Sequence, residues 1–218
     1  NGGISGYFST ILNSFSASEV SGNAVSGGIC GYKCVIKNSY NLGSITSNDY
    51  QDIIAGILGG EGSVYNSYNV GKITGLRASV GGIAGWNSNV YNSYNLGQVN
   101  GDNLNWTGGI LGATFSNKKI IGNVSKGIAN GGGIFGIEEN VSNYTKITST
   151  VKNNYYLKTS ATYGLSAYQL NDNAEPLSED EMPSVISVIN GDNAFVEDTN
   201  NINNGYPILK WQAERENN

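Results

Sequence analysis

Apolar residues alternate with polar or small residues through much of the chain, up to about residue 156. The segment from Val90 to Leu96 shows the pattern clearly, because Val90, Tyr94 and Leu96 share one parity. A period of two predicts β-strands rather than helices. β-Branched and aromatic residues dominate these stretches, and glycine or asparagine stands at their ends, which also favours short strands.

A phrase of the form Gly-Gly-Ile-x-Gly, once Ala-Gly-Ile-x-Gly, occurs six times in the chain. Asparagine follows nine residues after the isoleucine in every copy except the fifth, which has Lys119. The isoleucines are Ile4, Ile29, Ile57, Ile83, Ile110 and Ile134, and the asparagines are Asn13, Asn38, Asn66, Asn92 and Asn143. Such a repeat is typical of stacked, quasi-one-dimensional folds, in which neighbouring units bury a shared core.

Successive isoleucines are 24 to 28 residues apart, and the length variation falls in polar stretches such as residues 48–52 and 102–105. A unit of this length suits three short strands and three turns. We therefore predict an all-β fold, a β-helix (β-solenoid) of about six coils. A β-propeller is the alternative, but its blades need longer repeats of about 40 residues.

Two recurrent residue types are expected to shape each coil. The asparagines nine residues after each isoleucine are expected to stack and bond from rung to rung, as in the Asn ladders of cross-β structures. Gly43, Gly71 and Gly97 are expected to form tight bends with positive φ.

The pattern changes after about Tyr156, where glycine becomes scarcer and the three prolines appear. Residues 178–181 have the spacing of a capping box, which predicts a short amphipathic helix that ends before Asn190-Gly191. Residues 206–211 predict a final edge strand. We divide the chain into solenoid repeats at 1–156 and a C-terminal cap with a final strand at 157–218, the cap protecting the open end of the rod.

The composition narrows the possible functions. Histidine is absent from the sequence, so Ser/His or Cys/His nucleophile pairs and His-based zinc sites cannot form. The formal net charge is -5 with no basic stripe, so we expect no nucleic-acid partner. No apolar run is long enough for a membrane span, so no membrane insertion is expected. We predict no cofactor and no metal site.

Cys30 and Cys34 are four residues apart and have no cysteine partners in other repeats. A disulfide between them would close a tiny loop and add little stability. We interpret them as two small buried or half-buried thiols.

Paired carboxylates could still hydrolyse a glycosidic bond, and polysaccharide lyases and pectin-degrading hydrolases use β-helices. The acidic side chains of the repeats, however, occupy unrelated repeat positions, mostly in turns or variable loops. They are Glu19, Asp49, Asp52, Glu61, Asp102, Glu138 and Glu139. Because these acids do not share a repeat position, we predict that the chain is not an enzyme. Catalysis by paired carboxylates remains the alternative.

Residues 81–85 (Gly-Gly-Ile-Ala-Gly), followed by residues 90–97 (Val-Tyr-Asn-Ser-Tyr-Asn-Leu-Gly), resemble the GLUG-motif repeat of large bacterial, clostridial-type cell-surface and secreted proteins. The copies at Ile29 and Ile57 match as well, and those at Ile110 and Ile134 are degenerate. Residues 195–211 are similar to the ending of such arrays. The resemblance implies an extracellular β-helical module and carries over no catalytic residue. The His-Glu-x-x-His zinc motif of the peptidases that contain such repeats is missing.

Aromatic residues stand three positions after the repeat isoleucine at Tyr7, Tyr32 and Trp86, while Gly60 interrupts the row. Exposed aromatic rings on a rigid face can stack on sugar rings. Together with Tyr65 and Tyr91, these residues are the candidate glycan-binding strip. The alternative is that the rings cover a turn and pack on each other, as we expect of Tyr40, Tyr68 and Tyr94.

Asp198-x-Asn200 ahead of Gly205 resembles part of a Ca²⁺ loop, but Ile202 occupies a position where a ligand is needed.

The main prediction is a non-catalytic, extracellular β-solenoid, located at the cell surface or secreted, that acts as a stalk or adhesive module. Its expected partners are a glycan or host-surface ligand and neighbouring domains of a larger protein. The alternatives are a carbohydrate-binding module and a polysaccharide lyase or glycoside hydrolase.

Overall fold

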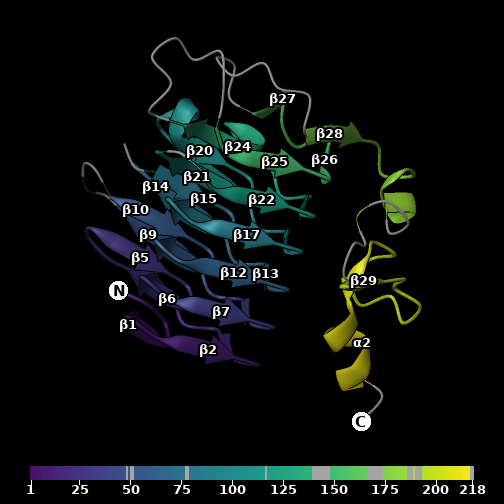
Figure 1. Ribbon diagram of the computed structural model, residues 1–218, viewed down its shortest axis with the longest axis horizontal. Coiled ribbons are helices and arrows are strands. Elements are labelled where there is room, and N and C mark those ends of the chain that lie inside the picture. Colours follow the sequence, from purple (N-terminus) through teal and green to yellow (C-terminus); the bar gives the residue numbers. More distant parts are fainter. Residues whose placement is uncertain are drawn as a thin grey trace.

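The computed structural model describes residues 1–47, 49, 52–76, 79–115, 117–138, 148–165, 174–185, 189 and 193–216. Over these residues the chain forms a β-solenoid of about six turns, stacked from the N-terminal coil upward in Figure 1. Strands of successive coils pair in parallel. The prediction of an all-β solenoid with about six coils is confirmed.

Four parallel sheets run along the solenoid. Sheet A contains β1 (Ser5–Tyr7), β5 (Val25–Gly27), β6 (Cys30–Tyr32), β10 (Ile53–Ala55), β11 (Leu58–Gly60), β15 (Ser79–Gly81), β16 (Ala84–Trp86), β20 (Thr107–Gly108), β21 (Leu111–Thr114), β24 (Gly132–Glu138) and β27 (Tyr163–Leu165). Sheet B contains β2 (Thr10–Leu12), β7 (Val35–Lys37), β12 (Ser63–Tyr65), β17 (Asn89–Tyr91), β22 (Lys119–Ile121) and β25 (Thr150–Lys152). Sheet C contains β3 (Phe15–Ser16), β8 (Tyr40–Asn41), β13 (Tyr68–Asn69), β18 (Tyr94–Asn95), β23 (Val124–Ser125), β26 (Asn154–Leu157) and β28 (Ala174–Leu177). Sheet D contains β4 (Val20–Ser21), β9 (Ile45–Ser47), β14 (Ile73–Gly75) and β19 (Val99–Gly101).

The repeat isoleucines form one buried column through the rod. Ile29, Ile57, Ile83, Ile110 and Ile134 are each 0% exposed. The amide of Ile57 donates to the carbonyl of Ile83 at 3.2 Å, and the amide of Ile83 donates to that of Ile110 at 3.0 Å. Ile4, in the first coil, is 45% exposed because one side of the column is open there. Burial of this column supplies the core that a single short coil cannot form alone.

The glycines ahead of Ile29, Ile57 and Ile83 lie directly against asparagines of sheet C. A Cβ on Gly56 would lie 2.3 Å from Cγ of Asn69 and 2.4 Å from the carbonyl oxygen of Gly82. No side chain fits at those distances. Backbone and side-chain amide approach each other so closely inside the coil that only glycine fits ahead of the isoleucine.

The amides that face these glycines form a buried ladder in sheet C. Nδ2 of Asn41 donates to Oδ1 of Asn69 at 2.9 Å, and Nδ2 of Asn69 donates to Oδ1 of Asn95 at 2.9 Å. Each Nδ2 also donates to the glycine carbonyl two residues later, at 2.7 to 2.9 Å. All three asparagines are 0% exposed. The ladder therefore satisfies polar groups that would be costly to bury unpaired.

The asparagines that were expected to form the ladder have a different shared property. Asn13, Asn38, Asn66 and Asn92 lie at the corner between sheets B and C with φ of 47° to 49°. Asn38 donates to Asn13 at 3.2 Å, but the continuous buried ladder lies three residues later. Asparagine tolerates the left-handed region better than most residues, which explains its recurrence at the corner. Asn143 lies outside the described residues.

The prediction of positive φ at Gly43, Gly71 and Gly97 is wrong. The described glycines with positive φ are Gly122 and Gly205. A Cβ on Gly71 would instead lie 1.9 Å from the carbonyl oxygen of Gly43 in the preceding coil. Close stacking of the coils, rather than a left-handed bend, excludes a side chain there.

Cys30 and Cys34 are both 0% exposed and form a disulfide. They face the core beside the isoleucine column. Their predicted burial is confirmed, whereas the interpretation as free thiols is wrong.

Parallel pairing continues beyond residue 156. β27 pairs with β24, and β28 pairs with β26. Pro176 and Glu175 lie in β28, at the edge of sheet C. Proline and charge at an edge strand oppose edge-to-edge association, so this segment protects one end of the rod.

One of the two bonds of the predicted capping box is present. Ser178 donates from its amide and its hydroxyl to Oε2 of Glu181, at 2.8 and 2.7 Å. A short 3₁₀ helix, η2 (Met182–Val185), follows. The rest of the predicted helix, residues 186–189, falls largely on residues 186–188, which lie outside the described residues.

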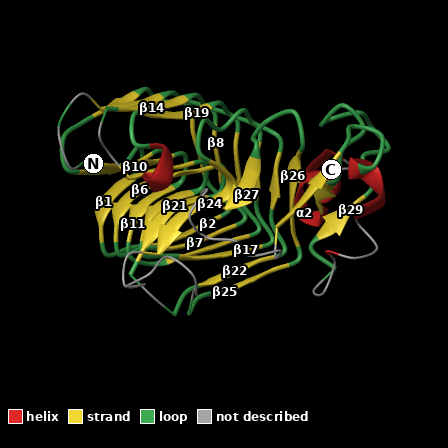
Figure 2. Ribbon diagram, turned by 90° about the horizontal axis from the view of Figure 1, so that it is seen from above, coloured by secondary structure: helices red, strands yellow, loops and turns green. Residues whose placement is uncertain are grey.

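The remainder of the cap packs along the side of the solenoid instead of over its end. β29 (Phe195–Val196) and β30 (Ile208–Leu209) form an antiparallel pair, and α2 (Lys210–Glu216) follows directly. Phe195 and Leu209 pack with Tyr94 and Tyr155 of sheet C. Figures 1 and 2 show α2 and β29 beside the stacked strands.

The predicted final strand over residues 206–211 is partly wrong, because Trp211 belongs to α2. Its ring lies 6.2 Å from that of Tyr40 and 5.9 Å from that of Tyr68. Its Nε1 donates to the carbonyl of Asn66 at 2.7 Å. The expected packing of Tyr40, Tyr68 and Tyr94 is confirmed, with neighbouring rings 4.8 and 4.9 Å apart.

Candidate functional site on the aromatic column

The candidate aromatic residues of sheet A stand in one column, which we call the aromatic column: Tyr7, Tyr32, Gly60 and Trp86. They occupy consecutive rungs, because Tyr32 pairs in register with Tyr7 and with Gly60, and Gly60 pairs with Trp86. The rings of Tyr7 and Tyr32 stack at 5.6 Å with an interplanar angle of 16°. The in-register repeat therefore converts sequence spacing into a row of rings.

Gly60 leaves a gap in this row that the backbone does not require. A Cβ there would lie 3.4 Å from Cδ2 of Tyr32 and 3.5 Å from Cβ of Trp86, which are ordinary contact distances. The neighbouring Gly59 is different, because its Cβ would lie 2.4 Å from the carbonyl oxygen of Gly31. Glycine at position 60 thus removes a ring from the column without relieving a backbone clash.

A groove of about 400 Å³ lies along the aromatic column. Its lining side chains are uncharged. They belong to Asn1, Gly6, Tyr7, Asn23, Ala24, Val25, Tyr32, Ile53 and Trp86. The groove therefore combines aromatic rings, two β-branched side chains and amide groups, a lining that suits a neutral ligand with an apolar face.

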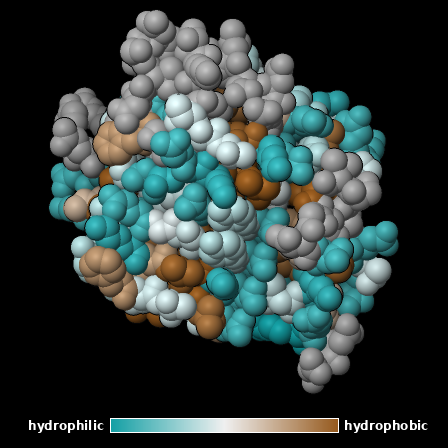
Figure 3. All heavy atoms as spheres, viewed as in Figure 1, coloured by the Kyte–Doolittle hydropathy of each residue, from teal (hydrophilic) through white to brown (hydrophobic). Residues whose placement is uncertain are grey.

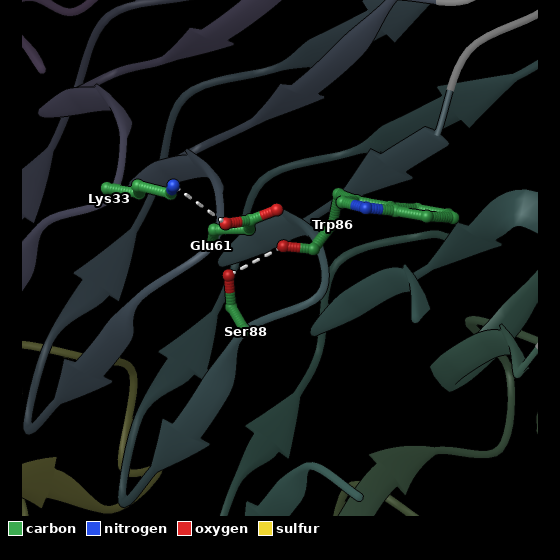
Figure 4. Close-up of polar contacts among 4 residues, drawn as sticks. All are labelled: Lys33, Glu61, Trp86 and Ser88. Atoms are coloured by element: carbon green, nitrogen blue, oxygen red, sulfur yellow. Dashed lines mark hydrogen bonds and ion pairs between the residues drawn. The ribbon is translucent and has the colours of Figure 1, made fainter. Parts of the chain in front are cut away.

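Trp86 is a fixed wall of this groove. It is 9% exposed, and its ring lies 5.8 Å from that of Trp106 and 4.8 Å from that of Phe115. Figure 4 shows the indole directed away from Lys33 and Glu61. Most of the Trp86 surface is therefore covered by aromatic packing, as the alternative prediction expects. Tyr7, in contrast, is 54% exposed.

Tyr65 and Tyr91 lie apart from the groove, on β12 and β17 of sheet B. Their rings stack at 4.8 Å with an interplanar angle of 3°. The ammonium group of Lys37 lies 5.2 Å from the centre of the Tyr65 ring. The five candidate residues therefore divide into two groups on different sheets rather than one strip.

A charged pair borders the aromatic column at the corner between sheets A and B. Nζ of Lys33 lies 3.5 Å from Oε2 of Glu61 (Figure 4). Both residues have positive φ, 54° and 46°. The pKa of Tyr32 is raised to about 12, mainly by a hydrogen bond with the Glu61 carboxylate and to a smaller extent by burial. The Tyr32 hydroxyl is therefore held by Glu61 and stays protonated at neutral pH.

The buried carboxylates of the repeats are occupied by structural hydrogen bonds. Asp52 accepts from the amide of Ala24 at 2.5 Å and from the hydroxyl of Ser47. Glu138 accepts from the amides of Thr148 and Ser149 at 2.8 and 3.0 Å. Asp52 and Glu138 secure loops between strands, as local side chain–backbone bonds do elsewhere. Glu139 lies outside the described residues.

The Asp198 loop is closed by its own backbone. Oδ1 of Asp198 accepts from the amide of Ile202 at 2.7 Å, and Oδ2 accepts from the amides of Asn203 and Gly205 at 2.6 and 3.0 Å. These three bonds fix the loop around the Asp198 carboxylate without a metal ion. Within the described ranges, no group of three or more acidic or cysteine side chains could hold a metal ion.

The groove residues that were not predicted include Asn23, Val25 and Ile53. They belong to β5, β10 and the loop before β5, which lies after the variable-length part of each repeat. Loop variation hides their alignment in the sequence. The register of Ile53 with Val25 becomes visible once β10 is aligned with β5. A shared β-branched character was the available signal.

Comparisons of the chain with family models, with curated proteins and with solved structures give no match. In the part of the chain that the structure describes, no helix has the length and apolar character needed to cross a membrane. Function is therefore inferred from the geometry of the chain itself.

Proposed function

We propose that this chain is a non-catalytic, extracellular β-solenoid module of a bacterial surface protein, which acts as a stalk or adhesive domain. The observation that carries the proposal is the column of fully buried isoleucines, continuous from the second coil to the sixth. Stacked coils with in-register hydrogen bonds form a stiff rod that can hold neighbouring domains apart or present a contact face. The resemblance to GLUG-motif repeats supports the same assignment.

The Cys30–Cys34 disulfide supports an extracellular location. Disulfides persist in oxidising compartments and at cell surfaces, whereas they are rare in reducing ones. The polar character of the outer surface is also consistent with an exposed rod, because the hydrophobic groups in Figure 3 form separate patches among hydrophilic ones.

The hydrogen bonding of the buried carboxylates supports a non-catalytic role. Each Asp52 oxygen accepts a hydrogen bond, and Glu138 accepts from two amides and the hydroxyl of Thr148. A general acid or nucleophile must instead present a free oxygen to the glycosidic bond.

The proposal is tested by coating beads with the purified chain and measuring their adhesion to host-cell and polysaccharide surfaces. Reducing ends and unsaturated products are measured in the same wells. We expect adhesion above that of albumin-coated beads, with no product. Product release from any polysaccharide would contradict the non-catalytic role and favour a lyase or hydrolase.

A second candidate is a carbohydrate-binding module. The specific observation in its favour is the uncharged groove of about 400 Å³ along Tyr7, Tyr32 and Trp86. Aromatic rings on a rigid scaffold bind sugar faces with little loss of side-chain entropy. In this candidate the adhesive contact of the module is made through the groove.

A further inference from the structure

The outer face of sheet B differs in charge from the rest of the molecule. Its six strands contain three lysines and no aspartate or glutamate, although the whole chain has 17 acidic and 12 basic residues. Lys37, Lys119 and Lys152 are all exposed. They lie far apart in the sequence, and the stacking of the coils brings them onto one sheet. Sheet B therefore presents a cationic face on a chain whose formal net charge is -5.

Strand alternation divides this face into two columns of outward-facing residues. The central residue of each strand is buried, as Ile36, Val90 and Val151 show, so its two neighbours face outward. The column nearer sheet C consists of Leu12, Lys37, Tyr65, Tyr91, Ile121 and Lys152. The column nearer sheet A consists of Thr10, Val35, Ser63, Asn89, Lys119 and Thr150. The face thus has lysine toward both ends and mostly uncharged polar groups between them.

The two cationic ends of the face are well separated. Lys37 lies on β7, whereas Lys119 and Lys152 lie on the neighbouring strands β22 and β25. Four rungs separate β7 from β25, which corresponds to about 19 Å. A ligand that contacts both ends must therefore be extended and must carry negative charge at more than one place.

Stacked tyrosines occupy the middle of the face. The rings of Tyr65 and Tyr91 lie 4.8 Å apart with an interplanar angle of 3°. The ammonium group of Lys37 lies 5.2 Å from the centre of the Tyr65 ring, and Ile121 is the next residue in register beyond Tyr91. Neighbours therefore cover the ring faces, while the side chains of a strand stand roughly perpendicular to the sheet. The pair offers ring edges and hydroxyl groups to a ligand rather than open aromatic faces.

We propose that the outer face of sheet B binds a linear carboxylated polysaccharide that lies along the axis of the rod. Its carboxylates contact Lys37 at one end of the face and Lys119 and Lys152 at the other. Its hydroxyl groups bond to the phenol hydroxyls of Tyr65 and Tyr91 between these ends. This inference rests on the adhesive role proposed above and assigns to it a contact face on sheet B.

The sparse charge of the face favours a polysaccharide over a nucleic acid. One nucleic-acid strand carries a phosphate about every 3.4 Å, roughly twice as many charges over this length as the face has lysines. Its bases also need open aromatic faces for stacking, and the faces of Tyr65 and Tyr91 are occupied. The corner between sheets A and B adds no net charge, because Lys33 and Glu61 pair there at 3.5 Å.

The probe is a fluorescently labelled oligogalacturonate that is long enough to span the face, measured by fluorescence anisotropy. We expect the parent chain to bind it at low ionic strength and to lose affinity as salt screens the charges. The galacturonate disaccharide is expected to bind at least about tenfold more weakly, because it cannot engage both cationic ends at once. A neutral galacto-oligosaccharide of the same length is expected to be indifferent to the lysines of sheet B.

Three variants test the residues of the face. The double variant Lys119→Gln and Lys152→Gln is expected to lose affinity for the long oligogalacturonate by about tenfold, and Lys37→Gln by about threefold. The double variant Tyr65→Phe and Tyr91→Phe keeps the stacked rings but removes their hydroxyls, so we expect a loss of about fivefold. All these side chains are exposed or half-buried, and circular dichroism verifies that the variants fold.

Lys72→Gln is the matched control, because it makes the same change in net charge at an exposed position next to β14 of sheet D. It should retain the affinity of the parent chain. An equal loss in Lys72→Gln would reduce the binding to net charge and overturn the face on sheet B. Tighter binding of single-stranded DNA than of oligogalacturonate would also overturn it, and so would a parent chain that does not bind the long oligogalacturonate.

The bead assay distinguishes failure of this inference from failure of the proposed function. Adhesion of the beads without binding of oligogalacturonate refutes the face on sheet B alone. Absence of adhesion to every surface, together with absence of binding, refutes the adhesive role as well.

Discussion

At the scale of single residues, the solenoid is held together by side chains that repeat their contacts from coil to coil. The buried ladder of Asn41, Asn69 and Asn95 connects three coils through hydrogen bonds between side-chain amides, each 2.9 Å long. Each amide also fixes the turn that follows, through Gly43, Gly71 or Gly97. A single asparagine thus stabilises both the local turn and the stack.

Asn69→Ala is expected to lower the free energy of unfolding by roughly 3 kcal/mol, because it leaves buried amide groups of Asn41 and Asn95 without this partner. Urea denaturation measures the loss. Asn100→Ala, on a partly exposed position of β19, is the matched control and changes stability by less than about 0.5 kcal/mol. Equal effects of the two substitutions would contradict the ladder.

Tyr32 provides a pH-dependent test of the corner beside the aromatic column. Its pKa is raised from 10.0 to about 12, chiefly by the hydrogen bond with Glu61. The folded state therefore holds the phenol proton more tightly than the unfolded state does. This contribution to stability is complete below pH 10 and is lost as pH rises toward about 12.

Glu61→Gln replaces the carboxylate whose hydrogen bond and negative charge raise the pKa of Tyr32. Ultraviolet titration of phenolate formation should show one tyrosine ionising at lower pH than in the parent chain. Tyr7, which stacks on Tyr32, remains in both proteins. An unchanged titration curve would show that Glu61 does not control Tyr32.

At the scale of elements, the strands and their stacking could be predicted from the sequence, but several details could not. The alternation near Val90 and the spacing of the isoleucines were sufficient for parallel, in-register coils. The Asn41 ladder was missed because asparagine also recurs at the corner three residues earlier. Sequence spacing alone does not distinguish a residue required for its φ from one required for its hydrogen bonds.

The end of the ladder offers a stabilising substitution. Ser125 pairs in register with Asn95, and Oγ of Ser125 is buried without a partner among the described residues. Gly109 faces Ser125 as Gly82 faces Asn95, so an amide has comparable room. Ser125→Asn is expected to raise the free energy of unfolding by about 1 kcal/mol through new hydrogen bonds.

Thermal denaturation checks this gain. Ser125→Ala is the control, since it removes the unpaired hydroxyl but cannot extend the ladder. The account requires that Ser125→Asn be the more stable of the two variants. The reverse order would mean that the coil cannot accommodate the amide.

The cap element was only partly predictable. The capping box at Ser178 and Glu181 was visible as a local motif, and its bond from the Ser178 amide to Glu181 is present. The helical state of Trp211 was not visible, because the apolar run before it equally fits an edge strand. Its conformation is decided by contacts with Tyr40 and Tyr68, residues that lie far away in the sequence.

Trp211→Ala is expected to release α2 from the tyrosine stack, at a cost of roughly 2 kcal/mol to the docking of the cap. Hydrogen exchange should become faster in residues 193–216 while the isoleucine column stays protected. Lys210→Ala, at an exposed position of the same helix, is the control. Faster exchange throughout the solenoid would contradict a separately docked cap.

At the scale of the whole molecule, one stacking rule organises the core, the corners and the candidate site. In-register coils bury isoleucine at one position and place asparagine with a left-handed backbone conformation at another. They also align Tyr7, Tyr32 and Trp86 along a groove. The column of aromatic residues and its gap at Gly60 could be predicted from the repeat. The groove itself could not be predicted, because Val25 and Ile53 follow loops of variable length that obscure their alignment in the sequence.

Cross-linking between coils tests this register most directly. Thr46, Thr74 and Asn100 occupy consecutive rungs of sheet D at positions that are not buried. Neighbouring rungs are about 4.8 Å apart, within the Cα range of a disulfide, whereas two rungs span about 10 Å. Under mild oxidation, the pair Thr46→Cys and Thr74→Cys should cross-link efficiently, and the pair Thr46→Cys and Asn100→Cys should not. Failure of the first pair, or cross-linking of the second, would contradict the in-register solenoid.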